Sequence, residues 1–387
     1  MNRLFIHVFS FTVALFAVVL VIYFGKNVIL NYYAKPLQDS LQRTISLQND
    51  LESGKIVLFG SSELVLYPNQ RFLPQNYFNN VLNLPLRAQG NEGQQTFVIM
   101  AQLAACDNDI VRENARVVIL LSPSWFTGGN ENGLTMPKFL EYMYSGMMNK
   151  LYFQSETDDK YKELVSKYVQ ENISRIKEPN YIYKYTLDTL EEDYLDNEVK
   201  KNIIQAFDNK DINPQMITYS RPAFDYDSLK IEAKQVELSS SNNEYGINNE
   251  YYTKYITPEI EKGNFPFSIV VPPKLEENQE YEDFLSLLDF LKTYKIKPLF
   301  VMQDLNPYVF MKNRETANEL MLNIKAKVLE HGYEYLDTWT YKKEDFQNLK
   351  TSLIIGIKEK FKQENITIPF PHIFIANAEE LKNESTS

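Results

Sequence analysis

Cysteine and histidine are scarce in this sequence, and their scarcity excludes several kinds of site. The chain has 387 residues but a single cysteine, Cys106, so it can form neither an intrachain disulfide nor a cysteine-rich zinc site. The histidines are His7, His331 and His372, which leaves few candidates for a histidine base. Glycine-rich phosphate-binding loops and internal repeats are absent as well. The sequence therefore predicts neither a metal nor an organic cofactor.

Basic residues are outnumbered by acidic ones, which bears on the choice of partner. The 40 Lys and Arg face 51 Asp and Glu, a formal net charge of −11. A dedicated nucleic-acid-binding protein carries a basic face, so no nucleic-acid partner is expected. Hydrophobic residues make up 44% of the chain and charged residues 24%, as in ordinary folded proteins. The length is sufficient for a complete core in one or two domains.

One long apolar run lies near the N-terminus. Residues 4–24 contain no Asp, Glu, Lys or Arg. A helix of that length rises about 30 Å, the thickness of the hydrocarbon core of a bilayer. No A-x-A cleavage pattern follows it, and Tyr32 and Tyr33 suit a membrane interface. We expect a single transmembrane anchor within residues 1–30, with the rest of the chain on one side; a buried helix of a soluble protein is the alternative.

Short apolar runs alternate with amphipathic segments along the rest of the chain. Five runs read as strands: Lys55–Gly60, Val81–Leu86, Arg116–Ser122, Pro298–Met302 and Tyr333–Asp337. Helical segments separate them at residues 94–105, 284–291 and 312–330. This alternation predicts an α/β fold with a mostly parallel sheet and helices on both faces.

The middle of the chain has a different composition. Residues 137–260 are rich in Tyr, Asn, Asp, Glu and Lys and contain few strand signals. Residues 160–175 and 187–208 are typical of charged helices. We interpret this stretch as a helical insertion in the α/β core, serving as a lid or docking surface or as a solvated decoration.

Hydroxyl side chains follow the first predicted strand, where Ser61 and Ser62 come directly after Gly60. Sites in open α/β sheets form beyond the carboxyl ends of the strands. A serine there can stand at the N-terminus of the next helix, where free N–H groups and the helix dipole favour negative charge developing on an oxygen. The pattern therefore fits an acyl-transfer nucleophile, although serine is equally a preferred helix N-cap.

The next two strand ends carry small or polar residues as well. After the second predicted strand the chain reaches Gly90, a residue type that lets the backbone approach a ligand and present its N–H. Gly90 beside Ser62 would supply two donors for an oxyanion. The third strand ends at Ser122. Three such ends on one edge favour a site more strongly than any one alone.

Four motifs together resemble the D-alanyl-lipoteichoic acid biosynthesis family DltD: GSSEL at 60–64, QGNEGQQ at 89–95, LSPSWF at 121–126 and PLFVMQDLNP at 298–307. The resemblance implies an SGNH-hydrolase-like fold over residues 31–348 and a single membrane anchor. It implies an extracytoplasmic protein that helps to transfer D-alanyl esters onto teichoic acid, together with the membrane acyltransferase DltB and the D-alanyl carrier protein DltC. By that resemblance Ser62 maps onto the nucleophile and Gly90 onto the oxyanion glycine.

The C-terminal part departs from the family pattern. No Asp-x-x-His segment, which carries the acid and base of the family triad, follows Asp337. Residues 349–387 instead form an atypical tail, part of which resembles the end of small-conductance mechanosensitive channels. His372 could serve as the base only if this tail folds across the strand ends. Asp304, just past a predicted strand, could orient a base or could cap a turn. His331 should lie at the opposite edge of the sheet.

Two hypotheses for the function follow. Under the first, the chain is a serine acyltransferase or esterase at the outer membrane face, with Ser62 as the nucleophile. Under the second, it is an inactive membrane-tethered binding or scaffold protein of the same pathway, because the usual base is missing. A serine without a general base loses about 10²–10⁴-fold in rate, so the missing segment weighs directly on this choice.

Overall fold

The computed structural model describes the chain in several stretches. These are residues 7–21, 23, 45–65, 73–106, 115–127, 134, 136–153, 155–172, 249–271, 274–306 and 309–339, with single residues at 217, 228, 231 and 243. Its strands are β1 (Ile56–Gly60), β2 (Leu86–Gly90), β3 (Arg116–Leu121), β4 (Phe267–Ser268), β5 (Leu299–Met302), β6 (Phe310–Lys312) and β7 (Glu334–Asp337).

The helices include several very short ones. They are η1 (Ser62–Leu64), α2 (Pro74–Asn76), η2 (Tyr77–Val81), α3 (Thr96–Ala104), α5 (Pro123–Phe126), α6 (Met136–Tyr142), α7 (Ser145–Phe153), α8 (Asp159–Asn172), α12 (Asn249–Tyr251), η5 (Tyr252–Ile256), α13 (Thr257–Glu261), η6 (Leu275–Glu277), α14 (Gln279–Thr293) and α15 (Arg314–Glu330). Residues 7–21 and 45–52 are helical too. The predicted helix at 187–208 and the tail at 349–387 lie outside the described residues.

Five strands form one sheet in the order β2-β1-β3-β5-β7, and every neighbouring pair is parallel. All residues of β1 and β5 are buried, as are those of β3 after Arg116. Strands buried on both faces need continuous apolar runs, which is what these segments contain. The predicted α/β class with a mostly parallel sheet is confirmed.

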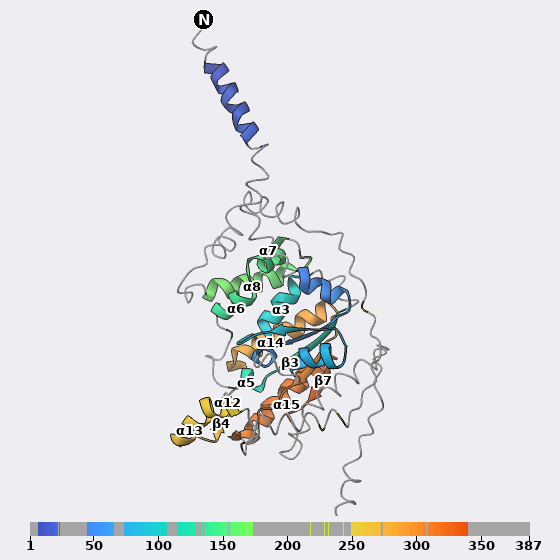
Figure 1. Cartoon of the computed structure of the whole chain (residues 1–387), viewed down its shortest axis with the longest axis vertical. Helices are drawn as coiled ribbons and strands as arrows, with labels where there is room; N and C mark the ends of the chain where they lie inside the picture. The colour runs from blue at the N-terminus through green and yellow to red at the C-terminus, as the bar shows by residue number, and fades with distance from the viewer. Residues whose placement is uncertain are drawn as a thin grey trace, which may run out of the picture. The chain divides into compact units, whose positions relative to one another are not determined.

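The helices α14 and α15 lie beside the five-stranded sheet (Figure 1), and their side-chain contacts place both on the face that carries Phe300. Phe300 of β5 packs against Phe284 of α14, with ring centroids 6.1 Å apart. Tyr335 is aligned with Phe300 across the β5–β7 pair, so both side chains share a face. The ammonium of Lys325, from α15, lies 5.7 Å from the Tyr335 ring centroid.

The opposite face carries a separate apolar cluster. Leu58, Leu120 and Val301 of the central strands contribute to it, together with Leu64 of η1 and Tyr77 of η2. These side chains come from the positions that alternate with Phe300 and its neighbours. The short segments after β1 are thus held to the sheet by buried apolar surface, which positions the chain just beyond Gly60.

The second strand begins later than predicted. Residues 81–86 were expected to form it, but β2 starts at Leu86 and runs to Gly90. Asn83 adopts a left-handed conformation with φ 51°, which ends any extended run before it. Leu82 and Leu84 lie in the bend and loop between η2 and β2, and their side chains are buried in the apolar cluster. Their burial produced the strand-like apolar signal, and the prediction was wrong for that reason.

The chain divides into two compact units, each described by itself. One holds residues 1–52, 98–113 and 135–214, and the other holds residues 53–97, 114–134 and 215–387, including the whole five-stranded sheet. In the first, α8 corresponds to the helix predicted at 160–175, and residues 7–21 form a helix with exposed side chains. Across the stretches described above, every helix is too short or too polar to cross a membrane.

Candidate functional site

The sheet has a topological switch point between β1 and β3. From β1 the chain passes outward to β2, and from β3 it passes in the other direction to β5 and β7. In open α/β sheets the connections diverge at such a point and leave a crevice at the carboxyl ends of the two strands. Ser61 and Ser62 follow the carboxyl end of β1, and Ser122 follows that of β3. Topology therefore places the predicted serine where ligands bind in folds of this class.

Ser62 is the first residue of η1, a single turn of three residues, and is half-buried. The N-cap position belongs to Ser61, whose side chain makes no capping bond. The Ser62 hydroxyl has no hydrogen-bond partner among the described residues, so it is not held as a cap. The expected helix dipole is weak here, because one short turn aligns few peptide units. Stabilisation of an oxyanion would depend on individual N–H groups.

Gly90 lies directly beside the end of β1. It is the register partner of Gly60 in the parallel β1–β2 pair. A Cβ atom added at Gly90 would stand 2.5 Å from the Gly60 carbonyl oxygen and 2.9 Å from Cδ1 of Leu64. Only a residue without a side chain allows this approach. The structure thus brings Gly90 next to the turn that carries Ser62.

Polar contacts hold this turn in place from two sides. The Ser61 hydroxyl donates to the carbonyl oxygen of Asn91, at 3.2 Å. The backbone N–H of Ser61 donates to Oε1 of Glu63, at 2.7 Å, and Nε2 of Gln303 donates to the same oxygen, at 3.0 Å. The backbone N–H of Gln303 donates to the Leu121 carbonyl, at 2.9 Å. Residues following β1, β2 and β5 are therefore joined at one edge.

Burial raises the pKa of the Glu63 carboxyl above its usual value, while hydrogen bonds from the backbone of Ser61 and Glu63 and from Gln303 oppose that rise. The Glu63 carboxyl is thus partly desolvated, and its hydrogen-bond donors are uncharged groups. No ion pair of Glu63 occurs within the described stretches. A carboxyl held in this way acts on its donors through hydrogen bonds.

Asp304 lies at the same edge, two residues past β5, but it faces a different partner. Its buried carboxylate forms an ion pair with Arg314, whose guanidinium also lies 4.2 Å from the Trp339 ring centroid. Burial raises the pKa of Asp304 to about 6, against the opposing effect of Arg314. Its second oxygen, Oδ2, is buried and has no hydrogen-bond partner within the described stretches. Its role as an orienting acid stays a prediction.

The two histidines considered as bases differ in what the structure says of them. His372 falls outside the described residues, so its role as the base stays a prediction. His331 caps the C-terminus of α15, three residues before β7 begins, and its ring stacks on Tyr333. It therefore lies at the amino ends of the strands, away from Ser62, as the sequence indicated.

The sequence analysis missed Glu63, Gln303 and Arg314. Glu63 and Gln303 belong to motifs that were singled out, and Gln303 directly follows a strand. The rule that sites gather at strand ends could have identified both. Their contact joins residues 240 positions apart, and no local pattern marks such a pair.

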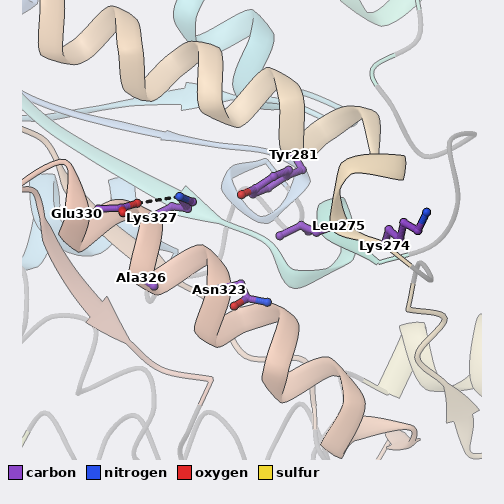
Figure 2. A pocket seen from close by; sticks show the side chains of 7 residues that line it. All are labelled: Lys274, Leu275, Tyr281, Asn323, Ala326, Lys327 and Glu330. Carbon is purple, nitrogen blue, oxygen red and sulfur yellow. Dashed lines mark hydrogen bonds and ion pairs between the residues drawn. The ribbon is translucent and has the colours of Figure 1, made fainter.

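A separate open pocket of about 760 Å³ lies between α15 and the start of α14, as Figure 2 shows. It is lined by Lys274, Leu275, Tyr281, Asn323, Ala326, Lys327 and Glu330. None of the predicted site residues is among them. Lys327 donates to Glu330 across 2.8 Å, which leaves this lining with little net positive charge. In the described part of the chain, no group of three or more His, Cys, Asp or Glu could hold a metal ion.

Comparison of the sequence with known protein families gives a match over the residues that carry the four motifs. The family model described as DltD protein matches residues 33–348, which is most of the chain. No curated protein matches the sequence. The matched range contains the five-stranded sheet, the Ser62 turn and Gly90. The chain belongs to the DltD family.

Proposed function

We propose that this chain is a membrane-anchored, extracytoplasmic serine acyltransferase or esterase with an SGNH-like site, in which Ser62 carries the acyl group. Membership in the DltD family means that the chain takes part in the D-alanylation of teichoic acid. The observation that carries the proposal is the Gly60–Gly90 register pair at the carboxyl ends of β1 and β2, where β1 is one of the two strands that border the switch point of the sheet. It brings the half-buried backbone of Gly90 beside the turn that carries Ser62, whose hydroxyl has no hydrogen-bond partner among the described residues.

In the proposed reaction, the Ser62 oxygen attacks the carbonyl carbon of a D-alanyl ester or thioester. The Ser62 O–H bond breaks as the new C–O bond forms, and the proton passes to a base. The N–H groups of Ser62 and Gly90 donate to the oxyanion that develops. The bond to the leaving group then breaks, and the leaving oxygen or sulfur takes the proton. A teichoic acid hydroxyl or water finally attacks the acyl carbonyl carbon and gives its proton to the base. The bond between the acyl carbon and the Ser62 oxygen then breaks, and the Ser62 oxygen takes that proton.

The proposed mechanism also requires a general base that takes the proton from Ser62. His372 is the candidate from the sequence, and Asp304 is the candidate to orient it. One oxygen of Asp304 makes no hydrogen bond to any residue that the structure describes, which supports a further partner for it. Without a base, donors to the oxyanion can leave only residual catalysis.

The proposed partners are the membrane acyltransferase DltB, the D-alanyl carrier protein DltC and a teichoic acid polymer. The proposed anchor is the apolar segment at residues 4–24. Its described part is helical, and side chains such as Phe9, Phe11 and Phe16 are more than half exposed. Apolar side chains arranged in this way favour contact with lipid or with another protein.

The alternative is an inactive, tethered scaffold of the same pathway. It is favoured by one observation, the absence of an Asp-x-x-His segment after Asp337. Both candidates would bind the same partners, and they differ in whether the Ser62 hydroxyl takes part in chemistry.

Replacing the Ser62 hydroxyl separates the two candidates. Cells that carry Ser62→Ala should lose esterified D-alanine on teichoic acid by about 100-fold or more if serine is the nucleophile. The measurement is ester-linked D-alanine per polymer phosphate, normalised to the amount of protein. The control is Ser124→Ala, which removes a hydroxyl from an exposed residue near the end of β3. Unchanged D-alanine in Ser62→Ala cells, at a normal protein level, would favour the scaffold.

Anchoring is tested separately on the full chain. We expect the protein to stay in the membrane pellet after a carbonate wash and to be released only by detergent, because the apolar segment is inserted in the bilayer. An externally added protease should degrade the main domain in cells whose wall has been removed. Release of the full chain by carbonate alone would contradict the anchor.

A further inference from the structure

The carboxyl of Glu63 is buried beside Ser62 and has no part in the mechanism proposed above. Its Oε1 accepts from two donors, the backbone N–H of Ser61 at 2.7 Å and Nε2 of Gln303 at 3.0 Å. We propose that Glu63, held by Gln303, is the positioning residue of the Ser62 site. It holds the backbone of Ser61, and so it sets where the Ser62 hydroxyl and N–H stand. The inference rests on the proposed function of Ser62.

Gln303 also connects the Glu63 carboxyl to the sheet. The backbone N–H of Gln303 donates to the carbonyl oxygen of Leu121, the last residue of β3, at 2.9 Å. Its side chain reaches Glu63 in the turn after β1. One glutamine thus ties the end of a central strand to the turn that carries Ser62.

The two glycines at the strand ends make room for the carboxyl. A Cβ atom on Gly60 would lie 2.5 Å from Oε1 of Glu63. A Cβ atom on Gly90 would lie 2.5 Å from the Gly60 carbonyl oxygen and would push that residue away. Bare backbone at both positions is therefore the condition for Glu63 to fold back over the end of β1.

The energetics also point to a positioning role. Burial raises the pKa of Glu63, so placing a carboxyl here costs stability. Its donors are uncharged and offset only part of that cost. The buried carboxyl instead provides precise geometry, since each oxyanion donor must lie within about 0.5 Å of its productive position.

The test uses the purified full-length chain in detergent and three variants. Glu63→Ala removes the acceptor of both hydrogen bonds. Gln303→Glu puts a second carboxylate against Glu63. In the double variant Glu63→Gln/Gln303→Glu, the new amide can accept from Ser61 N–H and donate to the new carboxylate, so the pattern is restored. Glu92→Ala is the matched control, because it truncates an exposed acid near the end of β2.

The first readout is the rate at which a fluorophosphonate labels the protein at pH 7.5, with Ser62→Ala as the unlabelled reference. We expect Glu63→Ala and Gln303→Glu to lower that rate by about 10–100-fold, as small misplacements in active sites do. The double variant should return to within about threefold of the wild type, a rescue that follows from the restored hydrogen bonds. Melting temperatures identify any variant that is merely unfolded.

The second readout is hydrogen–deuterium exchange of the peptide that contains Ser61, which needs no activity. Exchange of this peptide should speed up in both single variants and slow down again in the double variant. If the single variants match the wild type in exchange and labelling, or the double variant gives no rescue, Glu63 is not a positioning residue. If wild-type Ser62 is never labelled, the proposed nucleophile fails, while exchange still decides whether Glu63 holds the turn.

Discussion

At the scale of single residues, the candidate site depends on the absence of a side chain at Gly60 and at Gly90. Gly60 and Gly90 face each other across β1 and β2, and each lacks the side chain that would collide with its surroundings. For Gly90 the obstacle is backbone, the carbonyl group of Gly60. Backbone in a paired strand cannot rotate away as a flexible side chain can, so a substitution must separate the strands.

Gly90→Ala should therefore lower the free energy of unfolding by about 1–3 kcal/mol, the usual cost of overpacking. It should also abolish labelling of Ser62 by a fluorophosphonate, because the strand end and the turn move apart. Chemical denaturation and the labelling rate are the measurements. The control is Gly263→Ala, where a Cβ atom meets nothing within 4 Å and only the positive φ of 74° adds strain. A Gly90→Ala protein as stable and reactive as the wild type would contradict the close approach.

Asp304 shows at the same scale that the sequence can place an acid at a strand end without indicating which side chain it contacts. Its position after β5 was read correctly, but its carboxylate lies against Arg314, which in turn stacks on Trp339. The sequence places these residues 10 and 35 positions from Asp304, and neither spacing marks a contact. Side-chain partners of this kind are decided by packing.

At the scale of elements, the entry into β2 is set by one asparagine. Asn79 of η2 uses both ends of its amide: Nδ2 donates to the carbonyl oxygen of Leu86, and Oδ1 accepts from the Leu86 backbone N–H, each at 2.9 Å. The clamp satisfies both backbone groups of the first residue of β2. It therefore holds the first residue of the strand whose last residue, Gly90, lies opposite Gly60.

Asn79→Ala should lower the free energy of unfolding by about 1–2 kcal/mol, because two hydrogen bonds to backbone are lost. Chemical denaturation measures this loss. Asn80→Ala is the matched control: Asn80 is the exposed neighbour on the same turn, and its truncation should change stability by less than about 0.5 kcal/mol. Equal effects of the two substitutions would mean that the clamp does not set the start of β2.

At the scale of the whole molecule, two buried acids link stability to pH. Oε1 of Glu280, on α14, accepts from the Thr96 backbone N–H at 2.9 Å and from the Thr96 hydroxyl at 2.6 Å. Oε2 of Glu280 is buried and has no hydrogen-bond partner in the part of the chain that the structure describes. Burial, and next the charge of Asp283, raise the pKa of Glu280 well above its usual value. Burial raises the pKa of Asp283 to about 7. Both acids are more easily protonated in the folded protein than in the unfolded chain.

At these two carboxyls the folded protein therefore binds more protons than the unfolded chain between about pH 4 and about 7, so their contribution to the free energy of unfolding falls as the pH rises through that range. The contribution of these two protonated carboxyls to stability is complete below the pKa that they have in the unfolded chain. It is lost as the pH rises through the higher pKa that they have in the folded protein. Asp283→Asn should flatten this fall and raise the free energy of unfolding at pH 7.5 by about 1–3 kcal/mol. Unfolding measured from pH 4 to pH 8 checks this. Asp289→Asn, the same change at an exposed position of α14, should keep the wild-type slope.

Much of the architecture followed from the sequence alone. The runs that became β1, β3 and β5 were recognisable because a strand covered on both faces must be apolar throughout. The position of Ser61 and Ser62 just past β1 could be predicted because the strand before them was recognisable, and parallel strands end at a common edge. The role of Ser62 as a nucleophile stays a prediction. The second strand was misplaced because Leu82 and Leu84 are buried in a turn, and burial alone does not distinguish a turn from a strand.

The sequence by itself determined which segments are buried, since local apolar content and its period are properties of the chain. Only the tertiary structure decided the order β2-β1-β3-β5-β7, the pairing of Gly60 with Gly90 and the contact of Glu63 with Gln303. Those features join residues far apart in the chain. They depend on which surfaces are buried together, and the free energy gained by that burial is a property of the whole packed core rather than of any one segment.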